Sequence, residues 1–140
     1  MARLSSTIRV NASPDRTWAV VGDLDGVHRW IPGVTVCRIE GAKRICNEGE
    51  IQEEISDYSD ERRSYRYTHV RVPLPVKTSR GMFSVVPDNS GSLIVMESEI
   101  EALDPGQEGA LIRMIDGYYK QALESLRQLI EASGPREAAR

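Results

Sequence analysis

Three side chains in this 140-residue chain could together support acid–base chemistry: Glu54, His69 and Glu97. An apolar cavity raises the pKa of a carboxyl group, and two neighbouring carboxylates push their pKa values apart. Such a pair can remove a proton beside a carbonyl and return one to a leaving hydroxyl, which an aldol cyclisation followed by dehydration requires. A histidine, with its near-neutral pKa, can shuttle the proton. We therefore interpret these residues as candidate catalytic groups.

The local pattern also supports an interpretation in which both carboxylates face solvent. Glu54 alternates with Ile51, Glu53 and Ile55, the set that would normally point toward a core. Glu97 alternates in the same way with the apolar residues of its own stretch. A β-bulge or a curved sheet can turn a polar position inward, so both orientations remain open. For His69 the alternative is a surface or structurally hydrogen-bonded histidine.

The element expected to hold such a site together is a long helix over residues 107–132. Asp104-Pro105 precedes it and Gly134-Pro135 follows it, as helix boundaries require. The helical spacing of its apolar residues predicts a wide core-facing stripe, made of Leu111, Ile115, Tyr118, Ala122, Leu126 and Leu129.

The chain before this helix is predicted to be mostly β-strand. A first strand ends at Asn11-Ala12, and two short helices follow, one capped by Ser13 and one over residues 24–30. Six further strands are separated by short turns and are therefore antiparallel, at 34–40, 44–47, 50–58, 63–71, 76–87 and 92–102. We predict an α+β fold in which a curved seven-stranded antiparallel sheet surrounds the C-terminal helix and encloses a ligand cavity. One domain over 1–134 and a flexible tail over 135–140 are expected.

Composition limits the possible partners. The net charge of −3 and the pI near 5.5 argue against a nucleic-acid binder. The chain has no apolar run of membrane-spanning length and no signal-peptide pattern, so we expect no membrane insertion and a cytoplasmic location. Either a monomer or a homodimer is compatible with the sequence.

The two cysteines lie on opposite sides of a turn at Gly41-Ala42. If that turn is a two-residue hairpin loop, Cys37 and Cys46 oppose each other and could pair. Reduced thiols are the favoured interpretation for a cytosolic protein. No Cys/His cluster of metal-ligand spacing is present in the sequence, so no metal site is predicted.

The run from Trp18 to Val34, which contains Trp30-Ile31-Pro32-Gly33, resembles the START-like superfamily, also called SRPBCC or Bet v 1-like. Glu54, Tyr67 and Pro73-Leu74-Pro75 extend the resemblance, which covers about residues 3 to 131. The chain is most similar to the bacterial polyketide cyclase/dehydrase-like branch, which is also similar to plant abscisic-acid receptors. The resemblance implies the helix-grip form of the predicted fold.

The resemblance also implies which residues line the cavity. The matching wall positions are Glu54, Tyr67, His69, Ser79, Gly81, Glu97, Met114, Tyr118 and Ala122. Pro73, Leu74 and Pro75 match the cavity mouth, and Trp30 is a further ligand-binding candidate. Ser79 and Met96 depart from the branch's pattern, in which tyrosine and tryptophan are usual. Ordinary core packing is the competing interpretation for the tyrosines and methionines.

The function implied is that of a cofactor-independent cyclase, dehydratase or lyase acting on a hydrophobic polyketide-like or aromatic small molecule. The fold alone does not decide this, because the superfamily also contains carriers and receptors. A non-catalytic carrier or sensor for a hydrophobic small molecule is the alternative. A quinone- or lipid-binding module is a third interpretation.

Overall fold

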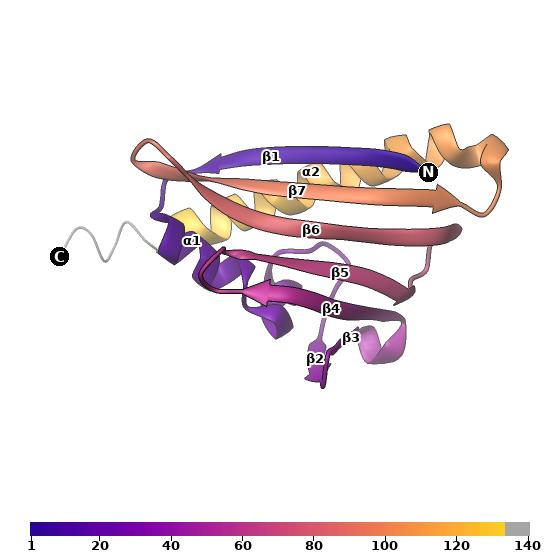
Figure 1. Cartoon of the computed structure of the whole chain (residues 1–140), viewed down its shortest axis with the longest axis horizontal. Coiled ribbons are helices and arrows are strands. Elements are labelled where there is room, and N and C mark those ends of the chain that lie inside the picture. The colour runs from indigo at the N-terminus through magenta and orange to yellow at the C-terminus, as the bar shows by residue number, and fades with distance from the viewer. Residues whose placement is uncertain (134–140) are drawn as a thin grey trace.

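Seven antiparallel strands form one sheet in the order β1-β7-β6-β5-β4-β3-β2, and a long helix packs along it (Figure 1). The structure is a computed structural model that describes residues 1–133. The strands are β1 (Ala2–Val10), β2 (Cys37–Glu40), β3 (Lys43–Cys46), β4 (Ile51–Ser59), β5 (Ser64–Arg71), β6 (Val76–Asp88) and β7 (Gly91–Ala102). The helices are α1 (Pro14–Val21), α2 (Glu108–Ser133) and the 3₁₀ helices η1 (Leu24–Arg29), η2 (Asn47–Gly49) and η3 (Pro105–Gln107). The predicted helix-grip fold is confirmed.

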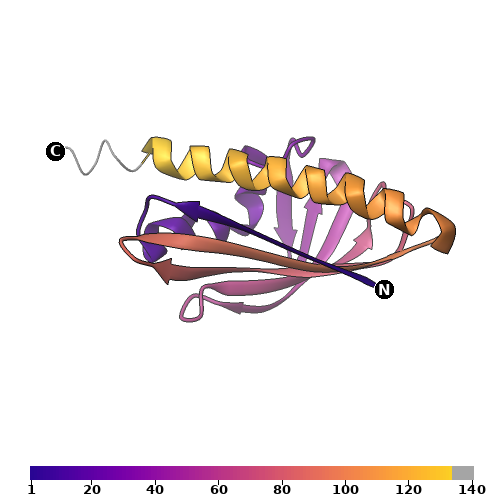
Figure 2. The same cartoon turned by 90° about the horizontal axis from the view of Figure 1, so that it is seen from above.

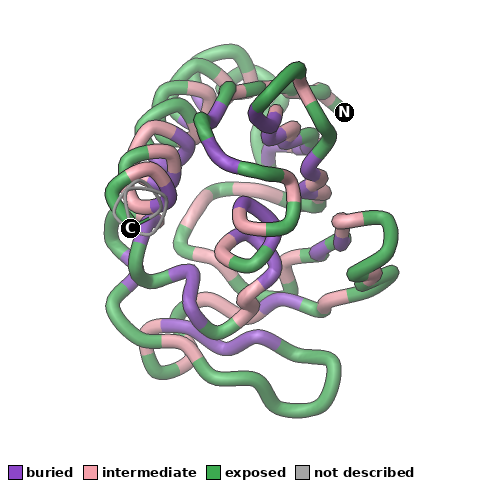
Figure 3. Tube along the Cα trace, turned by 90° about the vertical axis from the view of Figure 1, so that its left-hand side faces the viewer, coloured by how far each residue is buried: buried purple, intermediate pink, exposed green. Residues whose placement is uncertain are grey.

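Helix α2 runs along one side of the sheet, as Figure 2 shows. Its buried residues recur at helical spacing, and in Figure 3 they lie on the side of the helix that faces the rest of the chain. They are Leu111, Ile115, Ala122, Leu123, Leu126 and Ile130. Burial of this stripe against the sheet is what joins the two layers.

The short helix α1 begins as the sequence predicted. The Ser13 side chain accepts a hydrogen bond from the Arg16 backbone N–H at 3.2 Å, and Pro14 follows as the first helical residue. Helices α1 and η1 lie at the end of the sheet where strand β1 terminates (Figure 1). They bring the buried Trp18 and Val27 into the larger of two apolar clusters.

The start of one strand differs from the prediction. Strand β2 begins at Cys37 and not at residue 34. Thr35 forms hydrogen bonds with the side chain of Asn47 and not with a neighbouring strand. The Asn47 side-chain oxygen accepts hydrogen bonds from the Thr35 backbone N–H at 2.8 Å and hydroxyl at 3.0 Å. The predicted helix exit at Gly134 and the tail over 135–140 lie outside the described residues.

Cys37 and Cys46 form a disulfide between β2 and β3, so the expectation of two reduced thiols is wrong for this structure. The predicted register is confirmed, since the two cysteines are directly opposed across the hairpin. Their Cα atoms are 4.1 Å apart. Within residues 1–133, no helix is long and apolar enough to cross a membrane.

Candidate functional site

A cavity of about 390 Å³ lies between α2 and the sheet, beside the β2–β3 hairpin. Its walls are mostly apolar, with contributions from Val27, Ile31, Val34, Ile51, Phe83, Met96, Ile100 and Ile115. The exposed residues among its lining define the mouth: Pro32, Gly33, Glu50, Pro73, Met114 and Tyr118. A cavity of this size and lining suits one small hydrophobic molecule.

The polar side of the cavity is a row of directly opposed residues on neighbouring strands. Arg44 on β3 is opposite Glu53 on β4, and Glu53 is opposite His69 on β5. The β5–β6 ladder ends one position earlier, yet its register places Ser79 of β6 as the next residue across from His69. Because opposed residues on one face of a sheet come close together, the four side chains form a continuous chain of contacts. We call these four residues the polar row.

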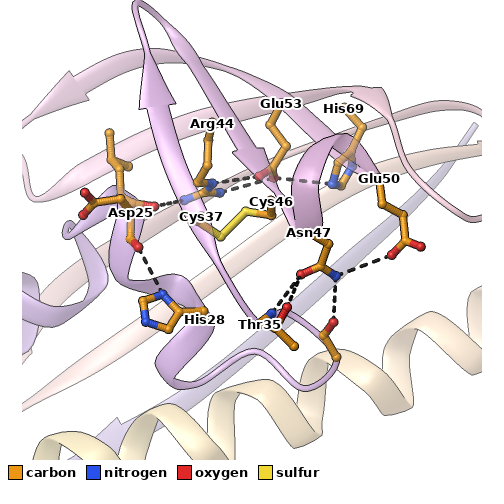
Figure 4. Close-up of a disulfide and its surroundings, with 12 residues drawn as sticks. Asp25, His28, Thr35, Cys37, Arg44, Cys46, Asn47, Glu50, Glu53 and His69 are labelled. Atoms are coloured by element: carbon orange, nitrogen blue, oxygen red, sulfur yellow. Dashed lines mark hydrogen bonds and ion pairs between the residues drawn. A yellow bond between two sulfur atoms is a disulfide. The ribbon is translucent and has the colours of Figure 1, made fainter.

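At one end of the polar row, Arg44 and Glu53 form a buried ion pair (Figure 4). Arg44 Nε lies 2.7 Å from one Glu53 oxygen, and a terminal nitrogen lies 3.2 Å from the other. The two side chains are only 2% and 8% exposed. Arg44 also donates at 3.3 Å to the Tyr65 hydroxyl and at 3.3 Å to the Leu24 carbonyl. The guanidinium therefore holds Glu53 in one orientation, with both carboxylate oxygens partnered.

Further along the row, His69 lies between the Glu53 carboxylate and the Ser79 hydroxyl. Its Nε2 is 3.4 Å from a Glu53 oxygen, and its Nδ1 is 2.8 Å from the Ser79 hydroxyl oxygen. Because an ionised carboxylate can only accept, the tautomer that suits this position carries its proton on Nε2. Nδ1 then accepts the hydrogen bond that the Ser79 hydroxyl donates.

His69 is a neutral imidazole at neutral pH. Burial lowers its pKa, and the positive charge of Arg44 adds to that effect, while Glu53 opposes it without reversing it. A neutral imidazole has a lone pair that can take up a proton. The histidine is thus in the protonation state that a general base needs.

Two phenols, Tyr67 and Tyr119, complete the polar groups of the cavity wall. Burial raises the pKa of Tyr67 well above its usual value, and the neighbouring Tyr119 phenol raises it further. Burial likewise raises the pKa of Tyr119. Both phenols therefore remain protonated at neutral pH.

The expectation that Glu54 and Glu97 face the cavity is wrong. Glu54 is exposed, and its neighbour Glu53 is the inward residue, 6% exposed. The ladder does shift between Gln52 and Glu53, but this irregularity leaves the alternation that points Glu54 outward intact. Glu97 lies in a groove on the other face of the sheet with Arg3, because Met96 and Ser98 on either side of it are buried. The two carboxylates cannot act together inside the cavity.

Seven of the other candidate residues line the cavity: Tyr67, His69, Ser79, Met114, Tyr118, Pro73 and Leu74. Four candidates do not. Gly81 is covered by the Tyr67 phenol, Ala122 is buried in the apolar core, and Trp30 packs edge-on against Phe83 at 5.7 Å between ring centroids. Pro75 is exposed and is not part of the cavity lining. The ligand-binding role of the seven lining residues remains a prediction.

The sequence reasoning missed Arg44, Glu53 and Tyr119 as site residues. Glu53 had a readable signal, since it belongs to the inward set of its strand. Arg44 had none, because its partner is known only once the register between β3 and β4 is known. Within residues 1–133, no three His, Cys, Asp or Glu side chains converge as a metal site requires.

Comparison of the structure with solved structures identifies similar folds. A protein from Thermobifida fusca has a TM-score of 0.81 and 26% identity, with 93% of each chain covered. The protein XoxI from Bacillus cereus has a TM-score of 0.82 and 23% identity, over 93% of this chain and 96% of that one. The Zhui aromatase/cyclase from Streptomyces sp. R1128 has a TM-score of 0.71 and 15% identity, over 98% and 95%.

Sequence comparison gives the family. No curated protein matches this chain significantly. The profile of the family described as "Polyketide cyclase / dehydrase and lipid transport" matches residues 1–131, which include every strand, all but the last two described residues of α2 and the whole polar row. The chain therefore belongs to the polyketide cyclase/dehydrase and lipid transport family.

Proposed function

We propose that this protein is a cofactor-independent cyclase, dehydratase or lyase for a hydrophobic polyketide-like or aromatic compound held in the cavity. The observation that carries this proposal is the neutral His69, fixed on the cavity wall between Glu53 and Ser79. Membership of the polyketide cyclase/dehydrase family and the likeness to an aromatase/cyclase support the same class of reaction.

The polar row suggests how a proton would be moved. The Ser79 hydroxyl takes a proton from the carbon beside a ligand carbonyl and passes its own proton to Nδ1 of His69. The imidazolium that results is stabilised by Glu53, which Arg44 holds in place. The protonated phenols of Tyr67 and Tyr119 donate to the developing enolate oxygen. The proton on His69 then returns to the leaving hydroxyl, which departs as water.

The charge balance of the cavity defines the ligand class. Arg44 and Glu53 cancel each other, and His69, Tyr67 and Tyr119 are uncharged at neutral pH. Glu50, the other acidic residue of the lining, is exposed at the mouth. The remaining interior lining is mainly apolar, and an unpaired ligand charge there would lose its hydration without gaining a partner. The expected ligand is therefore an uncharged ketone or phenol small enough for about 390 Å³.

The test follows the dehydration of a simple β-hydroxy ketone, the aldol of benzaldehyde and acetone, to its conjugated enone by near-ultraviolet absorbance. We expect catalysis that His69→Gln lowers about 100-fold or more, the usual contribution of a general base. Glu53→Gln is expected to lower it as well, whereas Glu54→Gln, one residue away and exposed, is the matched control. Equal rates for wild type and His69→Gln would refute the proposal.

The alternative is a carrier or sensor that releases its ligand unchanged, and one contact at the mouth favours it. The Tyr118 hydroxyl of α2 donates to the Pro32 carbonyl, which joins the helix to the loop after η1 across the cavity mouth. Opening this contact would admit a ligand without any chemistry. The family's description also includes lipid transport. Stoichiometric retention of an unaltered compound, unchanged by longer incubation, would support this alternative and count against catalysis.

A further inference from the structure

We propose that Ser79 is a nucleophile, and that the cavity transfers the acyl group of an uncharged ester or thioester through an acyl-Ser79 intermediate. This activity goes beyond the proposed cyclisation or dehydration, because it makes and breaks a covalent bond to the protein. It is carried by the order of contacts Ser79–His69–Glu53 along the polar row.

The two groups on either side of His69 fix the direction in which Ser79 donates. Glu53 faces Nε2 of His69 at 3.4 Å and can only accept, so Nε2 carries the proton. Nδ1 then presents its lone pair to the Ser79 hydroxyl at 2.8 Å. A serine that donates to a histidine, which is oriented in turn by a carboxylate, has the arrangement of an activated nucleophile.

Burial and paired strands hold Ser79, His69 and Glu53 firmly in this arrangement. Ser79 and Glu53 are 4% and 6% exposed, and His69 is 15% exposed in its side chain. Arg44 engages both oxygens of Glu53, so the carboxylate cannot turn away from the imidazole. All of these side chains stand on paired strands and not on loops, which fixes their spacing. Glu53 and Arg44 are positioning residues, and Ser79 and His69 would contact the substrate.

A substrate in the cavity would have access to Ser79. Ser79 is part of the cavity lining, together with the two protonated phenols. Tyr67 and Tyr119 line the same cavity, and their hydroxyls would donate to the oxygen that becomes negatively charged when a carbonyl is attacked. The apolar remainder of the wall accommodates an acyl chain or an aryl leaving group.

The chemical step balances without any further reagent except water. Ser79 Oγ bonds to the ester carbonyl carbon, its proton moves to His69 Nδ1, and the carbonyl electron pair moves onto oxygen. When the carbonyl re-forms, the bond to the alcohol or thiol breaks, and the proton on Nδ1 goes to that leaving group. A water molecule then attacks the acyl-Ser79 by the same route and releases a carboxylic acid and free Ser79.

The test uses p-nitrophenyl acetate, an uncharged aryl ester, with the intact protein at neutral pH. We expect a burst of p-nitrophenolate close to one equivalent, and a protein mass increased by one acetyl group. Proteolytic mapping should locate that group on the peptide containing Ser79. We expect Ser79→Ala to abolish the burst and Ser79→Cys to restore acylation as a thioester. Ser84→Ala, at a partly exposed serine of the same strand, is the matched control.

Several outcomes would overturn the inference. An acetyl group mapped to His69, a lysine or the N-terminus would mean simple chemical acylation. An unchanged burst in Ser79→Ala would mean the same. No burst at all from folded wild-type protein would mean that Ser79 is not nucleophilic. As a second readout, Glu53→Gln is expected to lower the acylation rate and change its pH profile. A purely structural Glu53 would leave the profile of the folded fraction unchanged. Aryl-ester acylation involves no dehydration, so its failure is distinguishable from failure of the proposed function.

Discussion

Replacement of Arg44 by methionine tests whether the polar row is held by charge compensation. The variant keeps most of the side-chain volume but leaves Glu53 as an unpaired carboxylate that is 8% exposed. Removal of one partner from a buried ion pair costs about 3–5 kcal/mol. Domains of this kind are stable by about 5–15 kcal/mol. We therefore expect Arg44→Met to remove at least about a fifth of the free energy of unfolding.

The double variant Arg44→Met/Glu53→Leu removes both charges and isolates their coupling. Replacement of a whole buried pair by apolar residues of similar volume is often neutral or stabilising. We expect the double variant to lie within about 1 kcal/mol of wild type or above it, although each single change is costly. Such non-additivity between contacting residues is what a double-mutant cycle measures.

The assay is urea unfolding followed by circular dichroism, with an unchanged m-value as the check that each variant folds. Arg38→Met is the matched control, because Arg38 pairs with Glu40 on β2 at 56% and 57% exposure. We expect that control to change stability by less than about 1 kcal/mol. The reasoning is refuted if Arg44→Met costs no more than Arg38→Met, or if the double variant is less stable than Arg44→Met alone.

Three further predictions use the same unfolding assay. Stability is expected to fall as the pH drops below about 6.5, because burial lowers the pKa of His69 and the unfolded chain then binds a proton that the folded chain does not. His69→Gln should lose that part of the slope, and an identical slope would contradict the assignment. Gly81→Ala should lower the free energy of unfolding by about 1–3 kcal/mol, because the new methyl would lie 2.5 Å from a backbone oxygen of β7 and 2.6 Å from the Tyr67 hydroxyl. An unchanged unfolding midpoint would argue against that packing. Reduction of Cys37–Cys46 should lower stability by at most about 3 kcal/mol, and Cys37→Ala/Cys46→Ala should no longer respond to dithiothreitol.

The architecture could be predicted because each level of the sequence agrees with the others. Helical spacing marks the buried face of α2, and short turns make the strands antiparallel. The hairpin register that opposes Cys37 and Cys46 follows from a two-residue turn and is observed. The bonded state of the cysteines does not follow from this register, because two opposed cysteines can be either reduced or paired.

The candidate site was predicted less well, and Glu53 explains why. The alternation of β4 points Glu53 inward, but a buried carboxylate is implausible until its partner is known. That partner is Arg44, which is opposed to Glu53 only because of how η2 connects β3 to β4. This turn contains Asn47 and Glu48 with positive φ, a conformation that asparagine favours but glutamate rarely adopts. The resemblance favoured Glu54, and the strand's own period was the better guide.

The position of the polar row connects the fold to both proposed activities. Inward positions of a sheet are normally apolar, and a charged residue there needs a compensating partner. Arg44 meets this need for Glu53, and Glu53 in turn orients His69 without requiring it to be charged. The imidazole can therefore remain neutral inside an apolar cavity, which is the condition for accepting a proton either from a ligand carbon or from Ser79. Without Glu53 and Arg44, burial would still lower the pKa of the histidine, but no neighbouring carboxylate would select one tautomer. The paired charges next to the cavity thus favour the tautomer in which Nδ1, the atom that faces Ser79, carries no proton.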